Sequence, residues 1–73
     1  MDRTVFRVLP QGDEWVLRQG DAVLATCGHK DDAVHQGRAV ARDHQPSQLV
    51  IHDSHGRIED EATYRDDPYP PQG

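Results

Sequence analysis

The chain has 73 residues, of which 13 are acidic and 8 are basic, so its formal net charge is −5. This length allows one domain with a thin core. The acidic balance argues against non-specific binding to nucleic acids or anionic membranes, which cationic surfaces drive, and the single cysteine excludes an internal disulfide and a cysteine-rich zinc site.

Alternation of apolar and polar residues, typical of strands buried on one side, fills the first part of the chain. It predicts strands at residues 3–9, 14–19 and 22–27. Turn-forming residues separate them, since Pro10 and Gly12 lie in the first connection and Gly20 lies in the second. Connections this short join neighbouring antiparallel strands, so we expect a three-stranded meander.

A helical period replaces the alternation after Gly28. One helix face collects Ala33, Val34, Gly37, Val40, Ala41 and His44. Asp31 and Asp32 stand in the first turn, where acidic residues complement the helix dipole, and Pro46 ends the helix near residue 43 or 44. Because Gly37 has no side chain, its place in the apolar stripe indicates close approach of the helix to the sheet.

Two further strands follow, at residues 48–53 and from 57 to about 63, with Gly56 in the turn between them. The predicted fold is therefore α+β. It is an antiparallel β-sheet with the element order β-β-β-α-β-β and one helix packed on one face. We expect residues 1–63 to form a single domain and residues 64–73 to form a proline-rich acidic tail.

Several short motifs run through the chain in a fixed order. They are Val8-Leu9-Pro10, Trp15-Val16-Leu17-Arg18 after a glycine, Lys30-Asp31-Asp32-Ala33-Val34, Leu49-Val50-Ile51-His52, Gly56-Arg57-Ile58, Tyr64, and Asp67-Pro68-Tyr69-Pro70-Pro71. This arrangement resembles the YdaT-like family of small bacterial proteins, catalogued as domain of unknown function 2188, from Phe6 to Gly73. The resemblance implies this fold and a bacterial cytoplasmic setting, and it implies no reaction.

Two positions depart from the pattern of that family. Cys27 stands where the family usually has an aromatic residue, which suggests a smaller core contact. His29 takes the place of a helix-capping threonine or serine, and a weaker N-cap lowers stability by about 1 kcal/mol.

Residues that could carry chemistry are few. His52, Asp53 and His55 form an H-x-x-H pattern with a carboxylate, but turn and surface positions explain them more simply. Cys27 lies two residues from His29 near a helix start, an arrangement that can activate a thiol, yet its strand parity favours a small core residue. We therefore predict no catalytic residue, no metal ligand and no cofactor.

Strand parity separates two faces of the sheet. The face toward the helix collects Phe6, Val8, Trp15, Leu17, Val23, Ala25, Leu49, Ile51 and Ile58. The opposite face carries Arg3, Val5, Arg7, Val16, Arg18, Leu24, Val50 and His52. A fully solvated face is usually more polar than this one, so we expect it to be a contact surface.

Several alternatives could explain what covers that face. The chain's own tail, with Tyr64 and Tyr69 and the acids Asp66 and Asp67, is the first. The second is another copy of the chain in a homodimer, and the third is a separate partner. A plain surface whose β-branched residues serve strand propensity is the simplest alternative, and the tail can equally be a solvated polyproline-like end.

The function predicted from the sequence is a non-enzymatic binding or accessory module, which contacts an unidentified protein or itself through this face and the tail. A nucleic-acid-associated protein using Arg3, Arg7 and Arg18 ranks behind it, because no aromatic residue on that face stacks bases. A metal- or thiol-dependent enzyme ranks last. The polar N-terminus and the lack of a long apolar stretch predict a cytoplasmic protein without a membrane partner.

Overall fold

The computed structural model describes residues 3–65 of the chain. The elements, in chain order, are β1 (Thr4–Gln11), β2 (Glu14–Gln19), β3 (Ala22–Cys27), α1 (Lys30–Asp43), β4 (Ser47–His52) and β5 (Ile58–Tyr64). The predicted α+β class and the chain order of the elements are confirmed. The first strand continues two residues past its predicted end, because Pro10 and Gln11 still pair with Trp15 and Glu14 of β2.

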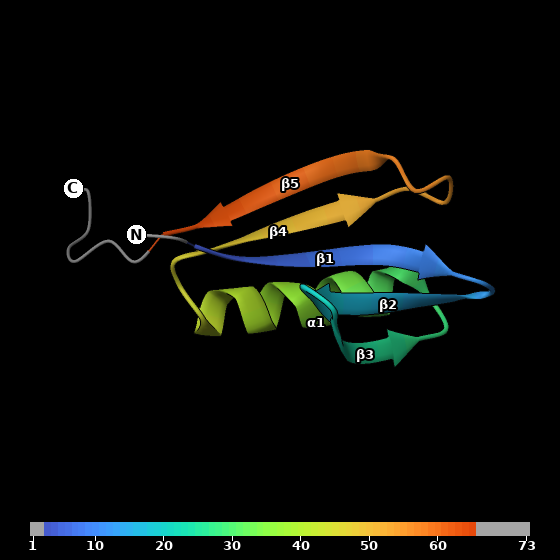
Figure 1. Ribbon diagram of the computed structural model, residues 1–73, viewed down its shortest axis with the longest axis horizontal. Coiled ribbons are helices and arrows are strands. Elements are labelled where there is room, and N and C mark those ends of the chain that lie inside the picture. Colours follow the sequence, from blue (N-terminus) through green and yellow to red (C-terminus); the bar gives the residue numbers. More distant parts are fainter. Residues whose placement is uncertain (1–2, 66–73) are drawn as a thin grey trace.

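The five strands form one mixed sheet, in the spatial order β3-β2-β1-β4-β5 (Figure 1). The first three make the expected antiparallel meander, and β4 and β5 form an antiparallel hairpin. The pairing of β1 with β4 is parallel, with Phe6 beside Leu49 and Val8 beside Ile51. The prediction of a purely antiparallel sheet is therefore wrong, and the strands do not follow one another across the sheet in chain order.

Strand direction explains the parallel pair. In the meander β1 and β3 run the same way, and they are the two strands whose outer edges stay free. Helix α1 carries the chain back to the other end of the sheet, so β4 runs in that same direction. It is then parallel to whichever free edge it joins. A meander followed by one returning helix cannot add its next strand in antiparallel fashion.

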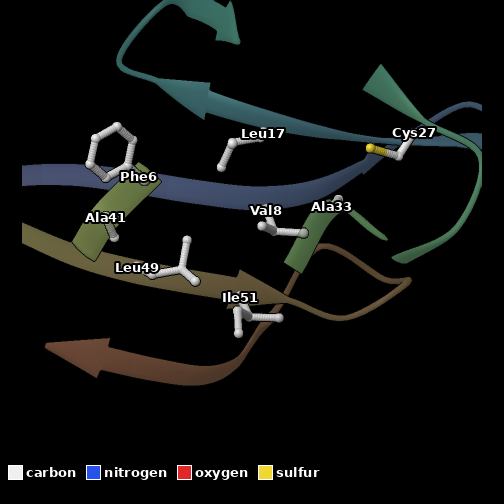
Figure 2. Close-up of a cluster of buried hydrophobic side chains, with 8 residues drawn as sticks. All are labelled: Phe6, Val8, Leu17, Cys27, Ala33, Ala41, Leu49 and Ile51. Carbon is white, nitrogen blue, oxygen red and sulfur yellow. The ribbon is translucent and has the colours of Figure 1, made fainter. Parts of the chain in front are cut away.

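Helix α1 lies along one side of the sheet and packs mainly on β1, β2, β3 and β4 (Figure 1). The core between them is drawn in Figure 2 and consists of Phe6, Val8, Leu17, Cys27, Ala33, Ala41, Leu49 and Ile51. Around it Trp15, Ala25, Val34 and Val40 are partly buried, as predicted for the face toward the helix. Burial of this apolar surface is the main force that holds the helix on the sheet.

Gly37 is the point of closest approach between α1 and the sheet. A Cβ atom at this position would lie 2.9 Å from Leu49 Cδ1 and 3.2 Å from Leu17 Cδ1. Real Cβ atoms do not come this close to a neighbour, so any side chain here must displace one of the leucines. The close approach predicted from the glycine is confirmed.

Polar contacts fix the two ends of α1. At its start Lys30 Nζ lies 2.7 Å from Glu59 Oε1 of β5 and 5.4 Å from the centre of the Trp15 ring. The N-cap residue His29 makes no side-chain capping bond, in agreement with the weak cap expected from the sequence. Near its end, the buried Ser47 hydroxyl donates to the carbonyl of Ala41 and joins the helix to the start of β4.

Two residues predicted to face the helix lie elsewhere. In β3 the register shifts opposite Leu17 and Arg18, so that Val23 pairs with Arg18 and is 50% exposed. In β5 a shift opposite Ile51 and His52 makes Ile58 the partner of His52, and Ile58 is 55% exposed. Each shift inserts one residue and reverses the alternation beyond it. The core positions predicted for Val23 and Ile58 are therefore wrong.

Candidate functional site

The side of the sheet opposite α1 is the most unusual surface of the described residues, and we call it the arginine face. Directly opposed residues of paired strands point to the same side of a sheet, so the register defines its members. They are Val5, Arg7, Leu9, Gln11, Glu14, Val16, Arg18, Val23, Thr26, Gln48, Val50, His52, Ile58, Glu61 and Thr63.

Two valines at the centre of the arginine face are buried although the helix lies on the other side. Val16 is 1% exposed and Val50 is 4% exposed. Their register partners include the long side chains Leu9 for Val16, and Arg7 and Glu61 for Val50. The face thus combines apolar side chains with long charged side chains whose aliphatic parts lie beside the valines.

Arg7 and Arg18 stand directly opposite each other on β1 and β2. Like charges in this position repel one another and destabilise a strand pair. Arg7 reaches toward β4, where its Nη1 lies 3.3 Å from His52 Nε2, and His52 Nδ1 lies 2.9 Å from the carbonyl oxygen of Gly56. Because a guanidinium only donates, a hydrogen bond between Arg7 and His52 requires Nε2 to accept and leaves Nδ1 to donate to the Gly56 carbonyl oxygen.

Arg18 has no comparable partner within residues 3–65. Its Nε is buried and makes no hydrogen bond there. The nearest carboxylate oxygen in an ion pair is Asp21 Oδ1, 4.0 Å from Nη2, at the outer limit for such a pair. A buried donor without an acceptor loses its hydration without compensation, so Arg18 retains capacity for an anionic ligand.

The register shows on which side of the sheet the residues predicted for the contact surface lie. It places Val5, Arg7, Val16, Arg18, Val50 and His52 on the arginine face. Arg3 precedes β1 and is exposed, whereas Leu24 is the extra residue where β3 shifts register and is 44% exposed. Tyr69 lies outside the described residues.

Tyr64 was predicted to open the tail, but it is the last residue of β5. It pairs with the buried Ser47, and it packs against the core on the helix side. Tyr64 therefore lies on the helix side of the sheet and not on the arginine face. The strand simply extends one residue further than the sequence pattern indicated.

Sequence reasoning did not include several members of the arginine face, namely Leu9, Gln11, Glu14, Val23, Thr26, Gln48, Ile58, Glu61 and Thr63. Leu9 has the same parity as Arg7 and pairs with Val16, so alternation alone could have included it. Val23 and Ile58 lie on this face only because of the register shifts. Neither strand contains a glycine or proline from which the shift could have been predicted.

The histidines near the β4–β5 turn hold the turn itself. Nε2 of His52 contacts Arg7, and Nδ1 of His52 contacts the carbonyl oxygen of Gly56. Asp53 Oδ1 accepts hydrogen bonds from the backbone N–H groups of His55 and Arg57. Within residues 3–65 no group of three or more His, Cys, Asp or Glu side chains is placed to hold a metal ion. The H-x-x-H pattern lies at a turn where the side chains of His52 and Asp53 make local hydrogen bonds and His55 contributes its backbone N–H.

Asp53 gives this turn a defined pH dependence. The Arg57 backbone N–H, and then that of His55, hold the pKa of Asp53 below its ordinary 3.8. A carboxyl whose pKa is lowered by folding stabilises the fold above its unfolded pKa and loses that effect as the pH falls through the folded pKa. We expect wild-type protein to be more stable than Asp53→Asn at neutral pH, with a difference that vanishes on acidification below 3.8.

Urea unfolding of both proteins across the acidic range measures this difference. Asparagine keeps an oxygen that accepts the two backbone bonds, so the comparison isolates the charge. A difference that stays constant down to the lowest pH would show that the carboxylate charge does not support the turn.

Cys27 ends β3 beneath the start of α1. It is buried, belongs to the core cluster, and its Sγ lies 3.5 Å from Gln36 Nε2. The small-core-residue interpretation is confirmed. Across the described part of the chain, α1 is too short and too polar to cross a lipid bilayer.

A shallow depression lies on the outer side of α1, lined by Asp31, Val34, His35 and Arg38. All four residues come from the one helix. Among residues 3–65 no second element contributes a side chain that would fix a ligand from another direction, so the depression is a weaker candidate site than the arginine face.

Comparison with known proteins gives one match. The family model described as "uncharacterized protein conserved in bacteria" (DUF2188) matches residues 6–64, which span β1 almost completely and every later element. No curated protein and no solved structure matches the chain.

Proposed function

The chain belongs to the DUF2188 family, and from this premise we propose that it is a non-enzymatic binding or accessory module that contacts a protein partner through the arginine face. One observation carries the proposal. Arg7 and Arg18 oppose each other beside the buried valines Val16 and Val50. Opposed like charges are unfavourable for the isolated sheet, and acidic groups of a partner that pair with each guanidinium would offset this cost.

The chemistry of the face favours an acidic protein surface over nucleic acid. Among the described residues the aromatic side chains of Phe6, Trp15 and Tyr64 all lie on the helix side, where they pack in or against the core. Single-stranded nucleic acids are held by rings on which the bases stack, together with a cationic groove. The arginine face offers guanidinium groups and aliphatic side chains, which suit carboxylates and an apolar patch.

The polar histidine adds specificity in this proposal. His52 accepts from Arg7 only when neutral, and this bond turns the Arg7 guanidinium toward β4. The two guanidinium groups then lie at different places on the face: that of Arg7 points toward β4, and that of Arg18 lies beside β3. We place the protein in the cytoplasm, the setting that the family resemblance implies.

Affinity capture from a bacterial lysate tests the proposal. The immobilised wild-type chain is compared with Arg7→Glu/Arg18→Glu and with the matched control Arg38→Glu/Arg42→Glu, which makes the same charge change on exposed residues of α1. We expect wild type and the control to retain the same protein and the face variant to lose it at least tenfold, as for loss of a charged pair at an interface. Circular dichroism verifies that each variant is folded.

Equal retention by all three proteins would overturn the proposal. Retention that disappears when the lysate is treated with nuclease would instead support the nucleic-acid alternative. Light scattering of the purified chain gives its mass in solution, and a dimer that the face variant converts to a monomer would identify a second copy as the occupant.

A further inference from the structure

The two edges of the sheet, formed by β3 and β5, differ in charge. Strand β5 carries Glu59, Asp60 and Glu61 in a row. Strand β3 contains no charged residue, although 29% of the residues of the chain are charged. Charged side chains on an edge strand are a usual protection against pairing with another chain, so β5 is protected in this way and β3 is not.

The edge of β3 also exposes apolar side chains. Val23 is 50% exposed and Leu24 is 44% exposed, and no other strand among residues 3–65 exposes two large apolar residues. Within the same residues β3 pairs only with β2, at the margin of the sheet shown in Figure 1. The backbone N–H and C=O groups on its outer side are therefore open to a further strand.

The register shift in β3 leaves part of this edge regular. Residues 25–27 pair with β2 in unbroken register, and Leu24 is the extra residue next to them. An extra residue bends the strand locally, but the ladder beyond it keeps its normal pattern. A further strand can therefore pair along residues 25–27 and cover the exposed side chain of Leu24.

Charge favours a second copy of the chain as the source of this strand. Two copies that met at β5 would oppose three carboxylates on each side, whereas two β3 strands oppose none. Antiparallel pairing also sets the start of β3 in one copy beside the end of β3 in the other. Asp21, whose side chain is fully exposed, stands just before β3, and His29 and Lys30 follow it. The carboxylate of each copy would thus meet the basic end of the other.

We propose that two copies of the chain associate by antiparallel pairing of β3 with β3, about a two-fold axis perpendicular to the sheet. The pairing joins the two five-stranded sheets into one, with both helices on one side and both arginine faces on the other. This inference goes beyond the proposed function, because it uses an edge of the sheet and leaves the arginine faces open, side by side. One pair of six-residue strands is a small interface, so we expect the dimer to dissociate on dilution.

Analytical ultracentrifugation of the full-length chain over a range of concentrations tests the inference. Wild type is compared with Leu24→Lys and with the matched control Ile58→Lys, which replaces an exposed aliphatic residue of the other edge strand by the same charged residue. We expect wild type and the control to change from one chain to two as the concentration rises. The dissociation constant of Leu24→Lys should be larger by roughly tenfold or more, because an apolar contact is lost. Circular dichroism verifies that each variant is folded.

A wild-type chain that stays monomeric at every concentration would overturn the inference, and so would equal effects of the two substitutions. NMR spectroscopy of wild type gives a second measurement that needs no variant. On concentration, the amide signals of residues 22–27 should shift and their protons should exchange more slowly with solvent, whereas those of β5 should not change. Shifts confined to Val16 and Val50 would place the second copy on the arginine face and contradict pairing at the edge.

Discussion

Replacing Gly37 with valine should remove most of the stability of the protein. The new Cβ would lie 2.9 Å from Leu49 Cδ1 and 3.2 Å from Leu17 Cδ1, and both leucines are fully buried. Overpacking of a dense core costs roughly 1–3 kcal/mol, and valine adds two methyl groups beyond the Cβ that already clashes. We expect a loss of about 3 kcal/mol, against a total of roughly 3–5 kcal/mol for a domain this small.

Urea unfolding followed by circular dichroism measures this loss. Arg38→Val places the same β-branched side chain at the next, exposed position of α1 and should change stability by less than about 0.5 kcal/mol. Gly37→Ala should lie between the two, because a gain of about 1 kcal/mol in helix propensity offsets part of its clash. A Gly37→Val protein as stable as wild type would show that α1 does not lie on Leu17 and Leu49 at this point.

Leu49→Ala should also remove most of the stability of the protein. Leu49 is fully buried in β4, beside Phe6 of β1 and Ala62 of β5, and directly under Gly37. Truncation removes favourable burial and leaves a cavity, which together cost about 2–5 kcal/mol for a buried leucine. The rigid sheet on either side cannot collapse into the space, so we expect a value near the middle of that range.

Leu24→Ala is the matched control, since Leu24 is the same residue type at 44% exposure on the edge strand β3. It should reduce the free energy of unfolding by less than about 1 kcal/mol, because little apolar surface leaves water there on folding. Equal losses for the two leucines, measured by urea unfolding, would contradict the assignment of the core to the helix side of the sheet.

The central strands could be predicted from the sequence because their alternation is uninterrupted. Phe6, Val8, Leu17, Leu49 and Ile51 all face α1 as their parity indicated. Prediction failed at the two edge strands, where a single inserted residue reverses the faces. Edge strands pair on one side only, so a register shift there disturbs fewer hydrogen bonds and leaves a weaker mark in the sequence.

The parallel pairing of β1 and β4 could have been predicted from the element order, because the order fixes the direction in which each strand runs. Contacts between side chains that are far apart in the sequence could not be predicted. Lys30 meets Glu59, and Arg7 meets His52, across separations of 29 and 45 residues that only the assembled sheet brings together. The sequence thus indicated six of the side chains on the arginine face, and the register showed that Arg7 and Arg18 stand opposite each other.

Site-specific photo-crosslinking tests most directly whether the arginine face is a contact surface. A photoreactive residue replaces Thr26, which is exposed on this face opposite Val16, and in a second protein replaces His35 on the outer side of α1. We predict that, in bacterial cells, crosslinks form from position 26 and join an acidic segment of a partner protein. Crosslinks that form equally from both positions, or only from position 35, would contradict a binding role for this face.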